Sequence, residues 1–138
     1  MKTLIGVVSG LVVWTAIVIV AGAIMRLSWP AYASVATAMT FTLPMLVARL
    51  SISVLATLAA GFVTAAIAPQ PTLVRLLPGI LLLIVFIPVH VSLWDKFPVW
   101  YHLTFLLSLV PLTYVGGTVW SRQQGNRAVP VAKEMKPV

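Results

Sequence analysis

The feature that most constrains the fold is an uncharged apolar run from Leu4 to Met25, bounded by Lys2 and Arg26. A helix needs about 20 apolar residues to cross a hydrocarbon core of about 30 Å, so the run predicts a membrane span. A secretory signal is the alternative, but the apolar core of a signal is usually only about 7 to 15 residues long. We therefore expect a retained transmembrane helix at about residues 4–25.

Three further apolar segments are long enough to span a membrane, at about residues 44–68, 73–93 and 99–120. Of the 138 residues, 61% are hydrophobic and 8% are charged, whereas about a quarter of the residues of a soluble domain are charged. The sequence predicts an all-α, polytopic membrane protein in which four transmembrane helices form an antiparallel bundle. The membrane domain is expected to cover residues 1–120.

Two segments do not fit this pattern of spans. Residues 27–43, LSWPAYASVATAMTFTL, are apolar, but as a fifth span they would leave no turn before the next helix. We expect them to form an interfacial or re-entrant segment between the first two spans. Residues 121–138 are polar and basic, and we expect a flexible cytoplasmic tail near anionic headgroups.

Basic residues in short loops predict the orientation, because they are enriched on the cytoplasmic side. If both termini lie on one side, most of the nine basic residues lie with them, and only Arg26, Arg49 and Lys96 lie on the other side. Both termini are therefore expected to be cytoplasmic. Amphipathic rings prefer the membrane–water interfaces, and we expect five interfacial anchors: Trp29, Trp94, Trp100, Tyr101 and Trp120.

Small residues recur along the predicted spans at intervals of one helical turn. Helices associate in a bilayer through close backbone approach and polar side chains. We assign six residues to helix packing: Ser53, Thr57, Gly61 and Ala65 on the second span, and Thr113 and Gly117 on the fourth. Packing within the bundle explains such a row. A second row on the second span leaves room for docking onto another membrane protein, and it contains Ala56, Ala60, Thr64 and Ala68.

Both histidines lie in PVHVSLWDKFPVWYHL, residues 88–103. In a helical hairpin, His90 and His102 come to a similar depth just inside the outer interface. We favour hydrogen bonding of each imidazole to water, to Asp95 or to a freed backbone carbonyl. The alternatives are haem ligation by the two imidazoles and a quinone or proton site. We expect no bound cofactor; if there is one, His90 and His102 are the residues to hold it.

Several function classes are disfavoured by what the sequence lacks. The chain has no cysteine, which excludes disulfides, iron–sulfur clusters and thiol nucleophiles. It has no HExxH motif, no glycine-rich phosphate loop and no carboxylate pair within the spans, so we expect neither enzymatic activity nor a metal site. The net charge of +7 is scattered over helix ends and the tail, which is typical of topology signals and does not indicate nucleic-acid binding.

Three stretches carry a resemblance to known proteins: LIGVVSGLVVW at 4–14, LAAGFVTAAIA at 58–68 and PVWYHLTFLLSLVPLTYVGG at 98–117. In the order of these features the chain resembles small uncharacterised four-helix inner-membrane proteins of bacteria. The resemblance covers most of the chain outside residues 27–43 and the tail. It implies a bacterial inner membrane and carries no activity.

These observations together predict a small inner-membrane protein without its own catalysis. We expect it to contact the lipid bilayer and to serve as an accessory or assembly subunit, bound through small-residue faces to another integral membrane protein or to a second copy of itself. Two alternatives stay open. One is a redox or proton-handling protein that uses His90 and His102, and the other is an oligomeric channel for small solutes.

Overall fold

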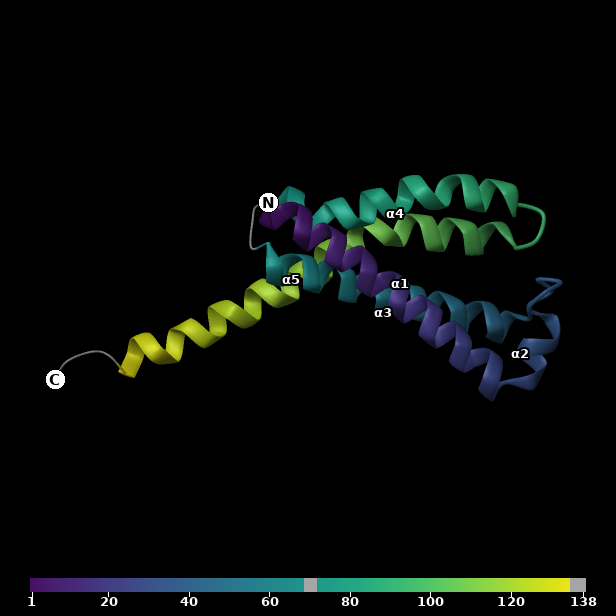
Figure 1. Ribbon diagram of the computed structural model, residues 1–138, viewed down its shortest axis with the longest axis horizontal. Helices are drawn as coiled ribbons and strands as arrows, with labels where there is room; N and C mark the ends of the chain where they lie inside the picture. The colour runs from purple at the N-terminus through teal and green to yellow at the C-terminus, as the bar shows by residue number, and fades with distance from the viewer. Residues whose placement is uncertain (69–71, 135–138) are drawn as a thin grey trace.

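The computed structural model describes residues 1–68 and 72–134, with side chains placed for residues 1–68 and 73–126. Within this part of the chain there are five helices and no strand, and four of the helices are long and apolar enough to cross a membrane (Figure 1). The four helices pack against one another. The predicted all-α, multi-pass membrane architecture is therefore confirmed.

The four long helices are α1 (Lys2–Ser28), α3 (Leu43–Ile67), α4 (Thr72–Ser92) and α5 (Val99–Glu134). Each begins close to its predicted start. The largest difference is at the other end of the last helix, because α5 continues to Glu134 where the sequence predicted an end at Trp120. Residues 121–134 contain the good helix formers Arg, Gln, Ala, Lys and Glu, and the helix continues beyond its apolar part although it includes Gly125 and Pro130.

Residues 27–43 form neither a span nor an extended strand. Trp29 ends α1, and a one-and-a-half-turn helix, α2 (Pro30–Val35), follows at once. Its first residue is a proline, whose fixed φ and missing N–H suit the first helical position. The chain then turns through Met39, which has a positive φ of 59°, and enters α3. This segment connects α1 to α3 at one end of the bundle (Figure 1), which agrees with the prediction of an interfacial connection.

α1 packs closely on α3 near the N-terminus. A Cβ atom on Gly10 would collide with the side chain of Thr64 and the backbone of Ala60. A Cβ atom on Gly6 would lie 3.0 Å from the Cβ of Ala68 and 3.0 Å from the Thr64 carbonyl oxygen. The Thr64 hydroxyl lies 2.8 Å from the Ala60 carbonyl oxygen and 3.2 Å from that of Gly6, so it bonds across the interface. Only small residues permit this approach.

α5 packs on α3 through a second set of glycines. A Cβ atom on Gly61 of α3 would overlap the backbone carbonyl of Thr113, and one on Gly116 of α5 would overlap that of Leu58. Thr113 is fully buried between the helices. Here the two backbones touch, which is the contact that a small-residue row provides in a bilayer.

Both small-residue rows of α3 are therefore occupied within the chain. The row expected to be available for a partner consists of buried residues, since the exposed fractions of its members are at most 1%: Ala56, Ala60, Thr64 and Ala68. The expectation that this row leaves a free docking face is wrong, because α1 covers it. Any partner has to bind somewhere else.

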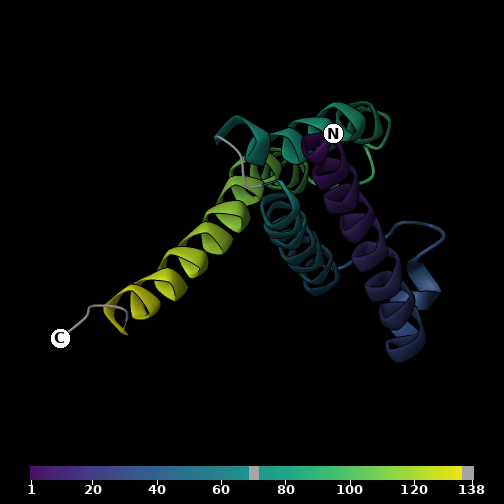
Figure 2. The same cartoon turned by 60° about the vertical axis from the view of Figure 1, so that its left-hand side comes forward.

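The helices converge at one end of the bundle and diverge toward the other (Figures 1 and 2). We call the end with Gly6, Gly61 and Gly116 the closed end. The open end carries α2 and the turn between α4 and α5, and there α1 lies apart from the α4–α5 hairpin in both views. The side chains with chemical interest lie toward the open end.

Candidate functional site

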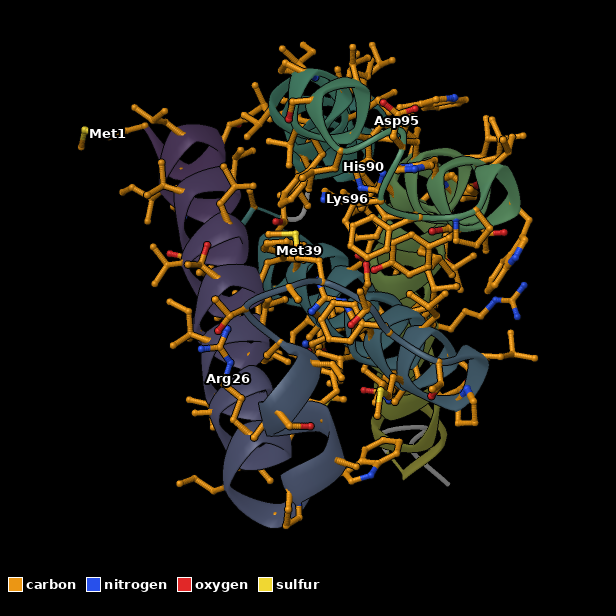
Figure 3. All side chains as sticks on the ribbon, turned by 90° about the vertical axis from the view of Figure 1, so that its right-hand side faces the viewer. Met1, Arg26, Met39, His90, Asp95 and Lys96 are labelled. Carbon is orange, nitrogen blue, oxygen red and sulfur yellow. The ribbon has the colours of Figure 1, made fainter. Side chains whose placement is uncertain are left out.

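The two histidines form a direct pair in the hairpin of α4 and α5. The Nδ1 atoms of His90 and His102 lie 2.7 Å apart, and the exposed fractions of the side chains are 7% and 0%. The imidazoles are therefore hydrogen-bonded to each other. The favoured prediction of water, Asp95 or a backbone carbonyl as the partner is wrong for the Nδ1 atoms, because they bond each other. Asp95 lies exposed in the turn (Figure 3).

Aromatic rings enclose the pair. The indole of Trp94 stacks on His102 with ring centroids 4.7 Å apart and an interplanar angle of 14°. The ring of Phe105 stacks on His90 at 4.6 Å, and Phe86 meets the same imidazole edge-on at 6.4 Å. This apolar enclosure strengthens the bond between the imidazoles, since a hydrogen bond is stronger in a low dielectric.

The pair also constrains where its protons lie. One Nδ1 must carry the hydrogen and the other must accept it. The Nε2 atom of His102 is buried and has no hydrogen-bond partner in the part of the chain that the structure describes. A buried N–H without an acceptor is rarer than a buried acceptor without a donor, so we assign the proton of His102 to Nδ1, which donates to His90. The His102 Nε2 atom is then a buried lone pair.

This geometry does not fit the binding of one metal ion between the two Nδ1 atoms. An imidazole nitrogen binds a metal ion at about 2.0–2.1 Å, so two ligands on opposite sides of an iron lie about 4 Å apart. The bonded Nδ1 atoms of His90 and His102 are 2.7 Å apart and leave no space for an ion between them. Within the described residues, no group of three or more His, Asp or Glu side chains could hold a metal ion.

A second polar cluster lies around Arg49, near the start of α3. Its Nη1 donates to the Tyr32 hydroxyl at 2.7 Å, and its Nε donates to the Tyr101 hydroxyl at 3.3 Å. The guanidinium carbon lies 4.8 Å from the centre of the Phe41 ring, within the range of a cation–π contact. Arg49 is thus half-buried and held against α2 and α5 by its two phenol partners.

The charge of Arg49 has no carboxylate beside it among the described side chains, because its partners are two phenols and a phenyl ring. The chain has only two acidic residues, Asp95 and Glu134. Asp95 is exposed in the α4–α5 turn. Glu134 ends α5, whose last turns lie far from α2 (Figures 1 and 2). The Arg49 cluster is therefore a cationic site within a largely apolar bundle.

Two cavities meet at Arg49, and we call them together the Arg49 cleft. One has a volume of about 170 Å³ and lies between α1, α3 and the α4–α5 hairpin. The other, of about 350 Å³, lies along α1 and also contains Arg26. Arg26 lies on α1 across the bundle from His90 (Figure 3). The lining residues are Trp14, Val18, Ile19, Gly22, Ala23, Met25, Arg26, Tyr32, Arg49, Ile52, Ser53, Phe86, Tyr101 and Phe105.

Ser53 lines the first cavity one helical turn from Arg49. Its side chain is only 5% exposed, and its hydroxyl oxygen is buried without a hydrogen-bond partner among the described residues. An unpaired buried hydroxyl costs about 1–3 kcal/mol. A donor is therefore available inside the cleft for an acceptor from another molecule.

The residues assigned to helix packing are all buried, and they include Thr57, whose hydroxyl accepts a bond of 3.1 Å from the Trp14 indole N–H.

The five residues expected to be interfacial anchors differ in their exposure. Trp94 and Trp100 are exposed at the open end, and Trp29 and Trp120 are half-buried. Tyr101 differs from the expectation, since it is 4% exposed and bonds Arg49. Tyr101 directly follows Trp100 on α5, and consecutive residues of a helix point in different directions around its axis. Tyr101 therefore faces the bundle while Trp100 is exposed.

The partners of Arg49 were not predicted from the sequence. Tyr32 and Phe41 lie in the segment 27–43, and Tyr101 lies 52 residues from Arg49 in the chain. The signal that could have found the site is Arg49 itself, because an ionisable residue within a span indicates a functional site. Tyrosines in the neighbouring apolar segments were then its natural partners.

No protein-family model, curated protein or solved structure matches this chain. The resemblance to small four-helix inner-membrane proteins of bacteria stays a prediction. The chemistry of the histidine pair and the Arg49 cleft is thus the basis for assigning a function.

Proposed function

We propose that this integral membrane protein acts by binding, without catalysis of its own, as an accessory or assembly component of a larger complex in a bacterial inner membrane. Its termini face the cytoplasm and its binding site is the Arg49 cleft. The observation that carries the proposal is the guanidinium of Arg49, which is held in the bundle beside two cavities and has no carboxylate partner among the described side chains.

A cation at this position is costly to keep in a membrane, and such residues usually face a bundle interior or a cavity and mark a functional site. The two phenols satisfy two of the five N–H donors of Arg49. They do not neutralise its charge. A structural role alone would be met as well by an apolar side chain, so the retained charge favours an anionic binding partner.

A binding role also fits the rest of the bundle. Both small-residue rows of α3 are used for internal packing, whereas the cleft has unused hydrogen-bonding capacity at Arg49 and Ser53. The described side chains of the cleft contain no acid–base pair, because Arg49 and Arg26 remain charged and no carboxylate lines the cavities. This supports binding in preference to catalysis.

The test compares Arg49→Gln with Arg122→Gln, which removes a basic charge from an exposed position on α5. Membranes are solubilised gently, and the size of the species containing the protein is measured by native electrophoresis. We expect the wild type and Arg122→Gln to migrate in one large complex and Arg49→Gln to migrate as the free protein. Equal migration of all three proteins at the free size would contradict an accessory role.

A second candidate function is quinone binding or proton handling at the histidine pair. The observation that favours it is the buried Nε2 atom of His102, which lacks a partner and can accept a hydrogen bond or a proton. Its test is extraction of bound quinone from protein purified in mild detergent. A quinone that is present in the wild type and lost in both His90→Ala and His102→Ala would support this function in place of the first.

A further inference from the structure

We infer that the Arg49 cleft binds a phospholipid of net negative charge, with the phosphate at Arg49 and Arg26 and an apolar chain in the cavity beneath. The inference rests on the proposed binding role of the cleft and specifies the chemical class of its ligand. Three features of the cleft lead to it: the number of donors around Arg49, the unpaired hydroxyl of Ser53 and the apolar wall.

The donors of the cluster exceed what its own residues accept. Arg49 uses Nε and one hydrogen of Nη1 on the two phenols, which leaves three of its five N–H donors. Tyr32 and Tyr101 each accept from Arg49, and each still has its own O–H to donate. Arg26 brings a second guanidinium to the same cavity. The residues that carry these donors line one or both cavities, and no described side chain in the lining supplies an anion.

A phosphate suits this set of donors better than a carboxylate does. Guanidinium groups bind phosphate through paired, charge-assisted hydrogen bonds, and the planar fork of arginine matches its oxygens. A carboxylate has two oxygens, which two guanidinium groups and two phenols would oversaturate. A phosphate group has more oxygens and can be shared between Arg26 and Arg49.

Ser53 gives an independent indication that the ligand extends into the bundle. Its hydroxyl is buried, lacks a partner and lines the cavity. It lies four residues beyond Arg49 on α3, which is about 6 Å along the helix. A lipid whose phosphate is at Arg49 places its ester carbonyls deeper in the membrane, at the level where the Ser53 hydroxyl can donate. An inorganic phosphate ion would leave Ser53 unpaired.

The walls of the cavity around Ser53 are apolar, with the rings of Trp14, Phe86 and Phe105 on three helices. Its volume is about 170 Å³, and an apolar cavity of about 150 Å³ is large enough to hold benzene. A segment of an acyl chain therefore fits. Ile19, which is exposed on α1, lines the adjoining cavity, so the rest of the lipid can stay in the bilayer.

The experiment measures lipid binding to the full-length protein in dodecyl maltoside by native mass spectrometry. Phosphatidylglycerol is the probe, and phosphatidylcholine of the same chain length is the reference. We expect one molecule of phosphatidylglycerol to bind per chain, at least about tenfold more tightly than phosphatidylcholine, since its headgroup lacks the choline cation that would face the two arginines. Equal affinities for the two lipids would overturn the inference.

Variants identify the site within this measurement. Arg26→Gln removes an exposed guanidinium that bonds none of the cluster's tyrosines, and we expect about tenfold weaker phosphatidylglycerol binding, which corresponds to a lost charge-assisted bond. Arg49→Gln should remove the preference for phosphatidylglycerol, and Ser53→Ala should weaken binding a few-fold. Arg122→Gln is the matched control and should bind normally. If Arg26→Gln and Arg122→Gln bind alike, the assigned site is wrong, even where Arg49→Gln fails to fold.

Two further probes separate the sources of the anion. Inorganic phosphate should not displace the lipid at millimolar concentration, and oleate should bind more weakly than phosphatidylglycerol. Displacement by inorganic phosphate at the lipid's own concentration, or tighter binding of oleate, would overturn the assignment to a phosphate-bearing lipid. If no lipid preference is found while Arg49→Gln still releases the protein from its complex, this inference fails and the proposed function stands. If the preference for phosphatidylglycerol depends on Arg26 but no complex is found, the inference stands and the proposed function fails.

Discussion

The closed and open ends of this bundle use the same four long helices in opposite ways. At the closed end, glycines bring the backbones of α1, α3 and α5 into contact, and the side chains between them are small. At the open end, Arg49, Tyr32 and Tyr101 are linked by hydrogen bonds around cavities of about 170 and 350 Å³. One end fixes the arrangement of the helices, and the other has space and polar groups for a ligand.

α1 shows most clearly what separates the two ends. Gly6 and Gly10 lie against α3, and a Cβ atom on either would meet α3 atoms at 3.0 Å or less. Gly22, three turns further along the same helix, has nothing within 4 Å of a built Cβ atom and lines both cavities. A glycine in a membrane helix therefore indicates a close contact only where a neighbouring helix is present.

The largest effect is expected from adding one methyl group at the closed end. Gly61→Ala forces a Cβ atom into the backbone carbonyl of Thr113, so α3 and α5 must separate. Overpacking of this kind costs about 1–3 kcal/mol and occasionally more. We expect the upper part of that range because the clash is with backbone atoms, which can be relieved only by moving a whole helix and not by a change of side-chain rotamer. The measurement is unfolding in mixed micelles with increasing dodecyl sulfate, followed by circular dichroism.

The matched control is Gly22→Ala, the same change at the open end. Since nothing lies within 4 Å of the added atom, we expect stability to stay the same or to increase by about 0.5 kcal/mol, through the lower entropy of the unfolded chain. Similar losses for Gly61→Ala and Gly22→Ala would show that the two ends are packed alike, and the distinction between them would be lost.

The next largest effect concerns the polar cluster of the open end. Arg49→Gln removes the bonds to Tyr32 and Tyr101, and hydrogen bonds to charged groups contribute about 1.5–3 kcal/mol. Removing a charge from an apolar bundle offsets part of this loss, so we expect a net decrease in unfolding free energy of about 1–2 kcal/mol. Arg49→Lys keeps the charge but cannot donate to both phenols in one plane. Both variants are measured by the same unfolding experiment.

A double substitution provides the check. If the bonds to the phenols account for the loss of stability, Arg49→Gln should lower the free energy of unfolding much less in a protein that carries Tyr32→Phe and Tyr101→Phe than in the wild type. An unchanged difference would mean that Arg49 stabilises the open end through its charge and not through its hydrogen bonds to the two tyrosines.

The spans and the closed end could be predicted from the sequence because their determinants are local. Predominantly apolar runs of about 20 residues define a span, and small residues spaced by one turn of a helix mark where another helix can approach. The rows of α3 were recognised in this way, with Gly61 and Thr57 in one and Thr64 in the other. Which neighbour each row contacts was not predicted, because that depends on the order of the helices around α3.

The open end depends on rotation and on irregular backbone, which are not encoded by periodicity. The similar depth of His90 and His102 was predicted from their spacing about the turn, but their direct bond depends on how far α4 and α5 are rotated about their axes. The hydrogen-bond partners of Arg49 were not predicted. Its inward position depends on Tyr32, in a short helix of a segment whose conformation the sequence left ambiguous.

The histidine pair should respond to single and double substitution in different ways. His90→Phe leaves the Nδ1 atom of His102 buried without a partner, and an unpaired buried group costs about 1–3 kcal/mol. His102→Phe should have a smaller effect, because His90 is the less buried of the two. In the double variant no polar group is left unpaired, so we expect stability within about 0.5 kcal/mol of the wild type. Losses that simply add in the double variant would show that the two side chains do not interact.

The smallest effect is expected at Met39, in the turn between α2 and α3 at the open end. Its φ of 59° lies in the left-handed region, which costs a residue with a Cβ atom about 1–2 kcal/mol. Glycine avoids this cost but loses about 0.5–1 kcal/mol in conformational entropy, so Met39→Gly should raise stability by about 0.5 kcal/mol. Met39→Ala keeps the Cβ atom and should give no gain. Because Met39 is exposed, little packing is lost in either variant, and the difference between them reports the backbone strain less the entropic cost of glycine. A loss with Gly that matches the loss with Ala would mean that the methionine side chain, and not its backbone conformation, determines how the open end is held together.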